Sequence, residues 1–413
     1  MWLLLLMILI MPFETNPYLK ISPSFLGVFQ DFTVIKALGM IGLAVAMVRL
    51  AQGTEPPIFR SAQAKLFLGL YVGVLFAGLL SGSGFLAISR YLAFMLFMPF
   101  VLVSVRTHDD LRRVLFAIAL AFIIVFPYAL RQMFRYGGRL GVGLSETNYF
   151  AANLVLVIPL AFAIASVHRD PFKRKLWAVS GGVLVLALFL TSSRGGFLGL
   201  LVAGLVYAYR RKGLRGALIL LTVLMLAALP TGLGGRMVAT FLQGESEVAG
   251  LEQSNRAHTA LFWAGLRMAA DAPITGVGPE NFKALSLQYA PELAKSYIAH
   301  NTYLELAAET GLPVLLLFLL LVASALRTLN RATKLTGTPE ARELAGWSEG
   351  LRCGLLGFLV SGAFISAQYE KMFWVVIFTS IVVGRLVERH ERRMATEAAA
   401  PELTLAPVPA PAR

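Results

Sequence analysis

Charged residues are scarce in this sequence of 413 residues: they make up 15% of it, whereas 57% of the residues are hydrophobic. Soluble globular domains carry about 25% charged residues, so the deficit excludes an ordinary soluble protein. The apolar runs also lack the strict alternation of a transmembrane β-strand. In lipid, a run of roughly 20 apolar residues satisfies its own backbone hydrogen bonds as a helix. The composition therefore predicts an all-α, polytopic integral membrane protein.

Cysteine is nearly absent as well. The single residue, Cys353, excludes an intramolecular disulfide, so any large loop must be held together by packing. The first apolar segment, Met1 to Met11, is short and has no positively charged residue before it. A removable signal peptide normally has such a charge and a small-residue cleavage site, so we expect an uncleaved first span.

The apolar segments predict about twelve transmembrane helices with both termini in the cytoplasm. The sequence divides into transmembrane helices 1 to 9 (1–231), one large periplasmic loop with short helices (232–301), helices 10 to 12 (302–390) and a disordered cytoplasmic tail (391–413). The predicted spans are Met1 to Phe13, Phe32 to Leu50, Leu66 to Leu80, Phe85 to Val105, Val114 to Phe134, Asn148 to Val167, Leu176 to Leu190, Phe197 to Tyr209, Leu214 to Thr231, Thr302 to Leu326, Leu351 to Gln368 and Met372 to Val387.

The net charge of +14 would suggest a nucleic-acid partner in a soluble protein. Here the basic residues gather on every second connection between spans, as in Arg210, Arg211 and Lys212. Such alternation is the positive-inside rule of membrane proteins, and it accounts for the excess without nucleic acid.

A few arginines depart from this rule because they fall on the predicted outer side. Arg131, Arg135 and Arg139 are spaced by four residues, so in a continuing helix they would share one face. Like charges so placed repel one another unless an anion lies among them. They are candidate substrate-binding residues for a phosphate, or alternatively they solvate a helix end beside lipid headgroups.

A polar turn, Thr191 to Gly196, separates the seventh and eighth predicted spans. The free N–H groups at the start of a helix bind anions, and Arg194 adds a full positive charge there. Ser193 offers a hydroxyl, and the two glycines that follow would let a ligand approach the backbone. Alternatively, Arg194 complements the dipole of the preceding helix.

The large loop contains a helix that we expect to start at a cap on Ser254 or Asn255 and to run to Ala270. Arg256, Trp263 and Arg267 share one face of it, with the indole between two guanidinium groups. That face suits a phosphorylated sugar, or it anchors an interfacial helix on lipid. His258 is about 200° around the helix from Arg256 and is expected to face elsewhere.

His300 stands at the entry to the tenth predicted span, next to Asn301 and Tyr303. With a reference pKa of about 6.5, a histidine can accept the proton of a sugar hydroxyl at neutral pH. His300 is therefore a candidate catalytic base, and Asn301 and Tyr303 are candidate substrate-binding residues. Gly311-Leu312-Pro313 is expected to break or kink the helix that follows.

The pattern His300-Asn301, nine residues, then Gly311-Leu312-Pro313-Val314 resembles the histidine signature of the O-antigen ligase and polymerase family. The turn around Arg194, the helix from Arg256 to Trp263 and the run Pro273 to Gly278 also look like that family's elements. The resemblance covers roughly Gly143 to Phe318.

This resemblance implies a glycosyltransferase of the bacterial inner membrane with its active site facing the periplasm. Its donor would be a glycan on undecaprenyl pyrophosphate, with Arg194 and Arg256 binding the pyrophosphate and His300 activating the acceptor hydroxyl. Arg267 and the arginine run are added from spacing alone.

The chemistry of the residues agrees with that assignment. Glycosyltransferases that use Mg²⁺ need acidic ligands, and the sequence contains no Asp-x-Asp pair, so we expect no metal or other cofactor. The acceptor stays open among lipid A core, a growing glycan and a protein, with ligation to lipid A core preferred. A transporter for lipid-linked glycans is the alternative of another class, although no carboxylate falls near the centre of a predicted span. A non-catalytic assembly scaffold is a third reading.

Overall fold

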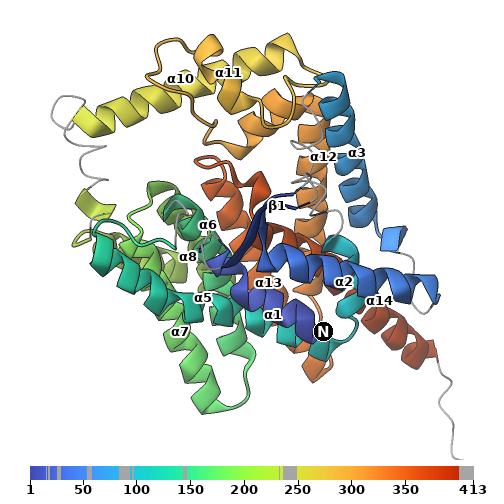
Figure 1. Ribbon diagram of the computed structural model, residues 1–413. Coiled ribbons are helices and arrows are strands. Elements are labelled where there is room, and N and C mark those ends of the chain that lie inside the picture. The colour runs from blue at the N-terminus through green and yellow to red at the C-terminus, as the bar shows by residue number, and fades with distance from the viewer. Residues whose placement is uncertain are drawn as a thin grey trace, which may run out of the picture.

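The computed structural model describes residues 1–14, 16, 19–25, 29–53, 58–82, 94, 97–142, 147–231, 233–235 and 249–399, without the side chains of 22–25, 29–31, 249–255 and 398–399. This part of the chain is helical apart from one hairpin (Figure 1). Its elements are α1 (Trp2–Ile10), η1 (Met11–Phe13), β1 (Lys20–Phe25), β2 (Phe29–Thr33), α2 (Val34–Ala51), η3 (Ile58–Arg60), α3 (Ala62–Leu80), α5 (His108–Tyr136), α6 (Thr147–Val167), α7 (Pro171–Leu190), α8 (Arg194–Ala228), α10 (Ala249–Asp271), α11 (Phe282–Tyr289), α12 (Thr302–Ala332), α13 (Pro339–Ser361), η5 (Ala367–Tyr369) and α14 (Lys371–Ala399).

Among the described residues, five helices are long and apolar enough to cross a membrane: α2, α3, α5, α6 and α12. The chain is therefore a multi-pass membrane protein, as its composition predicts. The plan of about twelve spans stays a prediction. About half of the expected span from Phe85 to Val105 lies outside the described residues, as do residues 400–413 of the tail and 236–248 of the loop. Residues 391–399, expected in a disordered tail, instead continue helix α14.

Several predicted boundaries need correction. Gly213, at φ 64° and ψ −163°, breaks α8 between the expected spans Phe197 to Tyr209 and Leu214 to Thr231, although α8 is not among the five candidate spans. The span expected from Leu351 to Gln368 instead begins at Pro339, because Thr338 caps the helix by accepting from the Ala341 N–H group. It ends at Ser361, which leaves a short connection, 362–370, before α14. In the loop, α10 ends as predicted but begins before Ser254 and Asn255, so neither residue caps it.

The hairpin of β1 and β2 is the one departure from an all-helical fold in the described chain. Its strands pair antiparallel with Lys20 opposite Thr33 and Phe25 opposite Phe29, and the register shifts between Lys20 and Ser22. A short hairpin between two helices carries little periodic signal, so helix-length apolar runs did not reveal it.

The bundle core forms where α13 lies against α6 and α8. Small residues allow this approach: a Cβ on Gly354 would come 2.3 Å from the Leu156 carbonyl oxygen, and one on Gly350 would come 2.6 Å from the Ala163 Cβ. Close backbone contact through small residues is the usual way in which helices associate in lipid. Because α13 is fixed in this way, the 362–370 connection is held beside the starts of α8 and α12.

The loop helices α10 and α11 lie together at one end of the bundle, over the start of α12 (Figure 1). They have a small core of their own, in which Leu261 and Met268 of α10 and Phe282 of α11 pack with Ala308 of α12. A Cβ on Gly265 would come 2.5 Å from Leu304, so α10 crosses α12 at close range. The loop is therefore docked on α12 and carries its polar residues with it.

Candidate active site

The turn before α8 presents the start of that helix at the edge of the bundle. Ser192 adopts a left-handed conformation with φ 48°, and Ser193 then caps α8 by accepting from the Gly196 N–H group at 3.2 Å. Arg194 is the first residue of the helix, so its charge adds to the positive end of the helix dipole. This geometry suits an anion, as the sequence indicates.

The glycines after Arg194 have a different purpose from the one expected. A Cβ on Gly195 would come 2.8 Å from the Cβ of Phe364, and one on Gly196 would come 2.6 Å from the Cβ of Ala151. Protein neighbours already fill the space assigned to a ligand. These glycines instead let α6 and the 362–370 connection pack against the turn.

Arg139 holds the turn from the other side. Its Nε donates to the Thr191 carbonyl oxygen at 2.7 Å and its Nη2 donates to Asn148 Oδ1 at 2.9 Å. The same Asn148 oxygen accepts from the Ser193 hydroxyl at 2.8 Å. Arg139 therefore fixes the turn that directly precedes Arg194.

The predicted face of three arginines does not form. Helix α5 ends at Tyr136, and Gly137 and Gly138 follow with positive φ angles, so Arg139 lies beyond the helix on which Arg131 and Arg135 stand. Both helical arginines are exposed, and the Arg135 guanidinium lies 5.6 Å from the centre of the Tyr136 ring. The spacing argument fails because it assumed a continuing helix.

His300 lies at a strained point of the backbone, with φ 50° immediately before α12. A non-glycine residue in the left-handed region costs about 1 to 2 kcal/mol and marks a position whose geometry the surroundings enforce. Asn301 caps α12 by accepting from the Tyr303 and Leu304 N–H groups, each at 3.1 Å. The Tyr303 hydroxyl donates to the Leu359 carbonyl oxygen at 2.6 Å. Asn301 and Tyr303 thus help to fix the backbone that presents His300.

Two buried glutamates of α12 extend this support. Glu305 accepts from the Ala299 N–H group at 3.1 Å and from the side chains of Ser366 and Gln368. Ala299 directly precedes His300, so the carboxylate anchors the segment that carries the histidine. Glu309 accepts from the Phe282 N–H group at 3.1 Å, which ties α11 to α12.

His258 lies against His300, contrary to the expectation that it faces elsewhere. Their ring centres are 5.4 Å apart with an interplanar angle of 63°, an edge-to-face contact. Burial lowers the pKa of His300, and burial, His300 and the nearby charge of Arg194 lower the pKa of His258. Both imidazoles are therefore neutral at pH 7. The segment around His300 approaches α10 from the side that His258 occupies.

The remaining candidates lie along α10. Arg256 stands two residues before His258 and is exposed. Trp263 is 54% exposed and contacts Phe262 edge to face. Its ring is therefore accessible on the exposed surface of α10, the helix that also carries Arg256. Arg267 instead donates to the Tyr289 carbonyl oxygen at 2.9 Å, at the end of α11. It contributes to the docking of the loop helices.

The structure thus places His258 of α10 against His300 at the start of α12, with the charge of Arg194 at the start of α8 close enough to lower the pKa of His258. The guanidinium group of Arg194, at a helix start, can neutralise an anionic leaving group. A neutral imidazole can accept a proton. Within the described residues, His, Cys, Asp and Glu side chains form no group of three that could hold a metal ion.

Comparison with known proteins supports the resemblance seen in the motifs. Residues 179–319 match the model of a family described as O-Antigen ligase. The match includes α8 from its first residue, the loop helices and α12 through its break, and hence all three clustered side chains. No curated protein matches the chain.

Proposed function

Because residues 179–319 carry the domain of the O-antigen ligase family, we propose that this membrane protein transfers a glycan from undecaprenyl pyrophosphate to an acceptor hydroxyl. The observation that carries this proposal is the edge-to-face contact of His258 with His300, together with the charge of Arg194 acting on His258. The site faces the periplasm at the bacterial inner membrane. The preferred acceptor is lipid A core.

The reaction follows from the chemistry of these groups. The acceptor hydroxyl gives its proton to the neutral imidazole of His300 while its oxygen attacks the anomeric carbon of the donor sugar. The bond from that carbon to the pyrophosphate oxygen breaks, and undecaprenyl pyrophosphate leaves with the electron pair. Arg194 and Arg256 neutralise the departing phosphates, as cations placed where negative charge develops. Attack from the opposite side inverts the anomeric centre.

The two arginines and the histidine need no metal in this scheme. Pyrophosphate is a good leaving group, so two guanidinium groups can supply the charge that Mg²⁺ supplies elsewhere. Trp263 offers a flat apolar face on which a sugar ring can stack.

The test is transfer by the purified protein in detergent, with EDTA present. Undecaprenyl-pyrophosphate glycan is the donor, and lipid A core or a second donor molecule is offered as acceptor. Product on lipid A supports the ligase, whereas a lengthened donor supports a polymerase of the same family. Arg194→Ala, Arg256→Ala and His300→Ala should each abolish product while the protein elutes as a folded species.

Two other outcomes would redirect the assignment. Transfer to a protein substrate alone would indicate a protein O-oligosaccharyltransferase. Movement of the glycolipid across vesicles, with no new glycosidic bond, would reject the enzyme and support a transporter. Normal product from the His300→Ala protein would remove the histidine as the base.

A further inference from the structure

A hollow of about 650 Å³ lies between α8 and α13, away from the candidate active site. Arg210 and Arg211 of α8 line it together with Arg342 and Glu349 of α13, and we call it the arginine hollow. Arg210 follows Arg194 after about 24 Å of α8, at 1.5 Å per residue, so the hollow lies toward the other end of the bundle. The positive-inside rule predicts that this end faces the cytoplasm.

A buried carboxylate organises one wall of the arginine hollow. Glu349 is 6% exposed and pairs with Arg210 at 3.2 Å and with Arg352 at 3.0 Å. A buried charge needs a partner, and here one carboxylate is shared between two guanidinium groups. The wall is therefore fixed, and an excess of positive charge remains on it.

Among the described residues, the other two arginines of the hollow, Arg211 and Arg342, have no carboxylate partner. Arg211 donates to the Ser166 hydroxyl at 2.9 Å, and its guanidinium lies 5.2 Å from the centre of the Tyr207 ring. Three positive charges thus line the hollow against one negative charge. Guanidinium groups gathered in this way repel one another unless an anion lies among them, and they bind phosphate oxygens well.

The placement of these arginines goes beyond what chain orientation requires. The positive-inside rule needs basic residues on one side of the membrane, but it does not need them to face a common space. Here Arg211 and Arg342 come from helices that are distant in sequence and line the same hollow. Their convergence favours a bound anion.

An apolar groove of about 940 Å³ adjoins the arginine hollow, and Arg210 lines both. It lies at the bend of α8, because Leu205 lines it before Gly213 and Leu214 and Leu218 line it after that glycine. Leu214 and Leu218 are 64% and 53% exposed, so the groove is open on the outside of the bundle. Apolar side chains so exposed in a membrane protein face hydrocarbon. An acyl chain can therefore enter the groove while its phosphate stays at the arginines.

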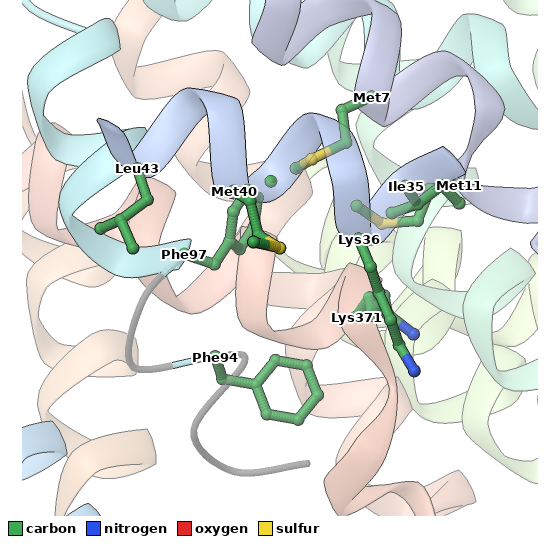
Figure 2. A pocket seen from close by; sticks show the side chains of 10 residues that line it. Met7, Met11, Ile35, Lys36, Met40, Leu43, Phe94, Phe97 and Lys371 are labelled. Carbon is green, nitrogen blue, oxygen red and sulfur yellow. The ribbon is translucent and has the colours of Figure 1, made fainter. Parts of the chain in front are cut away.

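The hollow between α1 and α2 is the rival site for an anion (Figure 2). Its two cations are lysines, Lys36 and Lys371, and Lys371 already pairs with Glu14. An ammonium group acts as a point charge, whereas a guanidinium group offers two parallel N–H groups to one phosphate. The arginine hollow is the better phosphate site of the two.

We propose that the arginine hollow binds the phosphate of an anionic phospholipid whose acyl chains lie in the groove on α8. The excess of positive charge selects an anionic head group over a zwitterionic one, and the groove selects a lipid over a soluble phosphate. Anionic lipids give the cytoplasmic leaflet its negative surface potential, so the ligand is present at this end of the bundle. This lipid is neither glycan donor nor acceptor, and the proposal holds whether or not the protein transfers a glycan.

The experiment measures binding and not transfer. The full-length protein in detergent is titrated with phosphatidylglycerol or phosphatidylethanolamine, and bound lipid is counted by native mass spectrometry. Phosphatidylglycerol should bind at least about tenfold more tightly, and it should raise the thermal unfolding midpoint. Inorganic phosphate should not displace it, because inorganic phosphate gains nothing from the apolar groove.

Arg342→Gln should weaken the binding of phosphatidylglycerol about tenfold, because it removes a charge-assisted contact to the phosphate. Arg342 is exposed near the start of α13, so the variant should fold. Arg215→Gln is the matched control, since Arg215 is exposed in the same basic connection as Arg211 but lines neither the hollow nor the groove. It should leave the affinity within about twofold of the wild type.

A second pair of variants tests the groove. Leu218→Asn places an amide in the groove and should weaken the binding of phosphatidylglycerol about fivefold, through the loss of apolar contact. Ile219→Asn is its control, because Ile219 is 65% exposed on the same helix but does not line the groove.

Equal affinities of the Arg342→Gln and Arg215→Gln proteins would overturn the proposal, because the attraction would then come from surface charge in general. Equal binding of phosphatidylethanolamine would overturn it as well. Displacement of the lipid by inorganic phosphate would show a site for a soluble anion and reject the lipid. Equal affinities of the Leu218→Asn and Ile219→Asn proteins would reject the groove as the site of the acyl chains.

Discussion

Gly276 and Gly311 each lie against the other's backbone segment. A Cβ on Gly276 would come 2.2 Å from the Glu309 carbonyl carbon, and a Cβ on Gly311 would come 2.2 Å from the Ile274 carbonyl oxygen. Both residues have positive φ angles, 65° and 83°. The run 273–278 fits into the break of α12 at this point.

Hydrogen bonds complete this joint. The Val277 and Gly278 N–H groups donate to the carbonyl oxygens of Ala308 and Glu309 at 2.8 and 3.0 Å, and the Leu312 N–H group donates to Pro273 at 2.8 Å. The loop thereby satisfies backbone groups that the helix break leaves open, as buried backbone groups require. The joint fixes the loop helices relative to α12, and so it fixes His258 relative to His300.

Gly276→Ala and Gly311→Ala should therefore both destabilise the protein and reduce transfer. We expect losses of roughly 2 to 5 kcal/mol, from left-handed strain together with overpacking against backbone. The measurement is the thermal unfolding midpoint in detergent. Gly337→Ala is the control, because Gly337 has φ 96° but nothing lies within 4 Å of its added Cβ. A midpoint for either test variant no lower than that of the control would contradict the tight joint.

The sequence predicts the structure of this region only in part. The break at Gly311 and the end of α10 before Pro273 were predictable, because glycine and proline act locally on the backbone. The contact of Gly276 with Gly311 was not, because it joins segments that periodicity treats separately.

The residues of the candidate site were likewise predictable from the sequence only in part. Arg194 and His300 stand at helix starts, where capping residues and a break in hydropathy identify them. His258 was missed because its partner comes from another segment. The prediction that Arg131, Arg135 and Arg139 share one helix face was wrong because Gly137 and Gly138 end α5 before Arg139.

Arg139→Ala should reduce kcat/KM about tenfold without removing a contact to the glycan donor. The reason is that a small displacement of catalytic groups lowers the rate strongly. The guanidinium group bonds to Thr191 and Asn148, and its loss releases the turn before Arg194. Asn148→Ala should give a similar loss, and the double variant should be no worse than either, as expected for one network. Steady-state kinetics in detergent would measure these values.

Arg135→Ala is the control for this series, because Arg135 is exposed and contacts Tyr136. It should change kcat/KM by no more than about twofold. A loss equal to that of Arg139→Ala would instead support direct phosphate binding by the arginines after α5.

Glu305→Gln should destabilise the protein by roughly 1 to 3 kcal/mol. The side-chain N–H₂ group of glutamine would lie opposite one of the groups that now donate a hydrogen bond to Glu305, so two donors would face each other in a buried site. The carboxylate accepts from Ala299 N–H and from the side chains of Ser366 and Gln368. Chemical unfolding in detergent would show the change. Glu292→Gln, at an exposed position after α11, should leave the midpoint unaltered. An unaltered midpoint for Glu305→Gln would show that the carboxyl group is not needed as an acceptor.

The pH dependence of transfer should separate the two histidines. A base must be neutral to accept a proton, and burial lowers the pKa of His300 below its usual 6.5. Transfer should therefore fall at a lower pH than it would with an ordinary histidine, as the pH drops through the lowered pKa. A profile of kcat/KM from pH 5 to pH 8 would show this acid limb.

His258→Phe is the informative variant for that profile, because phenylalanine can keep the edge-to-face contact while removing the second titrating group. If His258 only packs, the variant should retain transfer and the position of the acid limb. We expect instead a loss of about tenfold from displacement of the His300 ring, with the limb in place, because burial and not His258 lowers the pKa of His300. His300→Ala should lose roughly 10² to 10⁴ at every pH. An unshifted limb with full activity in His258→Phe would leave His300 as the only titrating residue of the pair that matters to transfer.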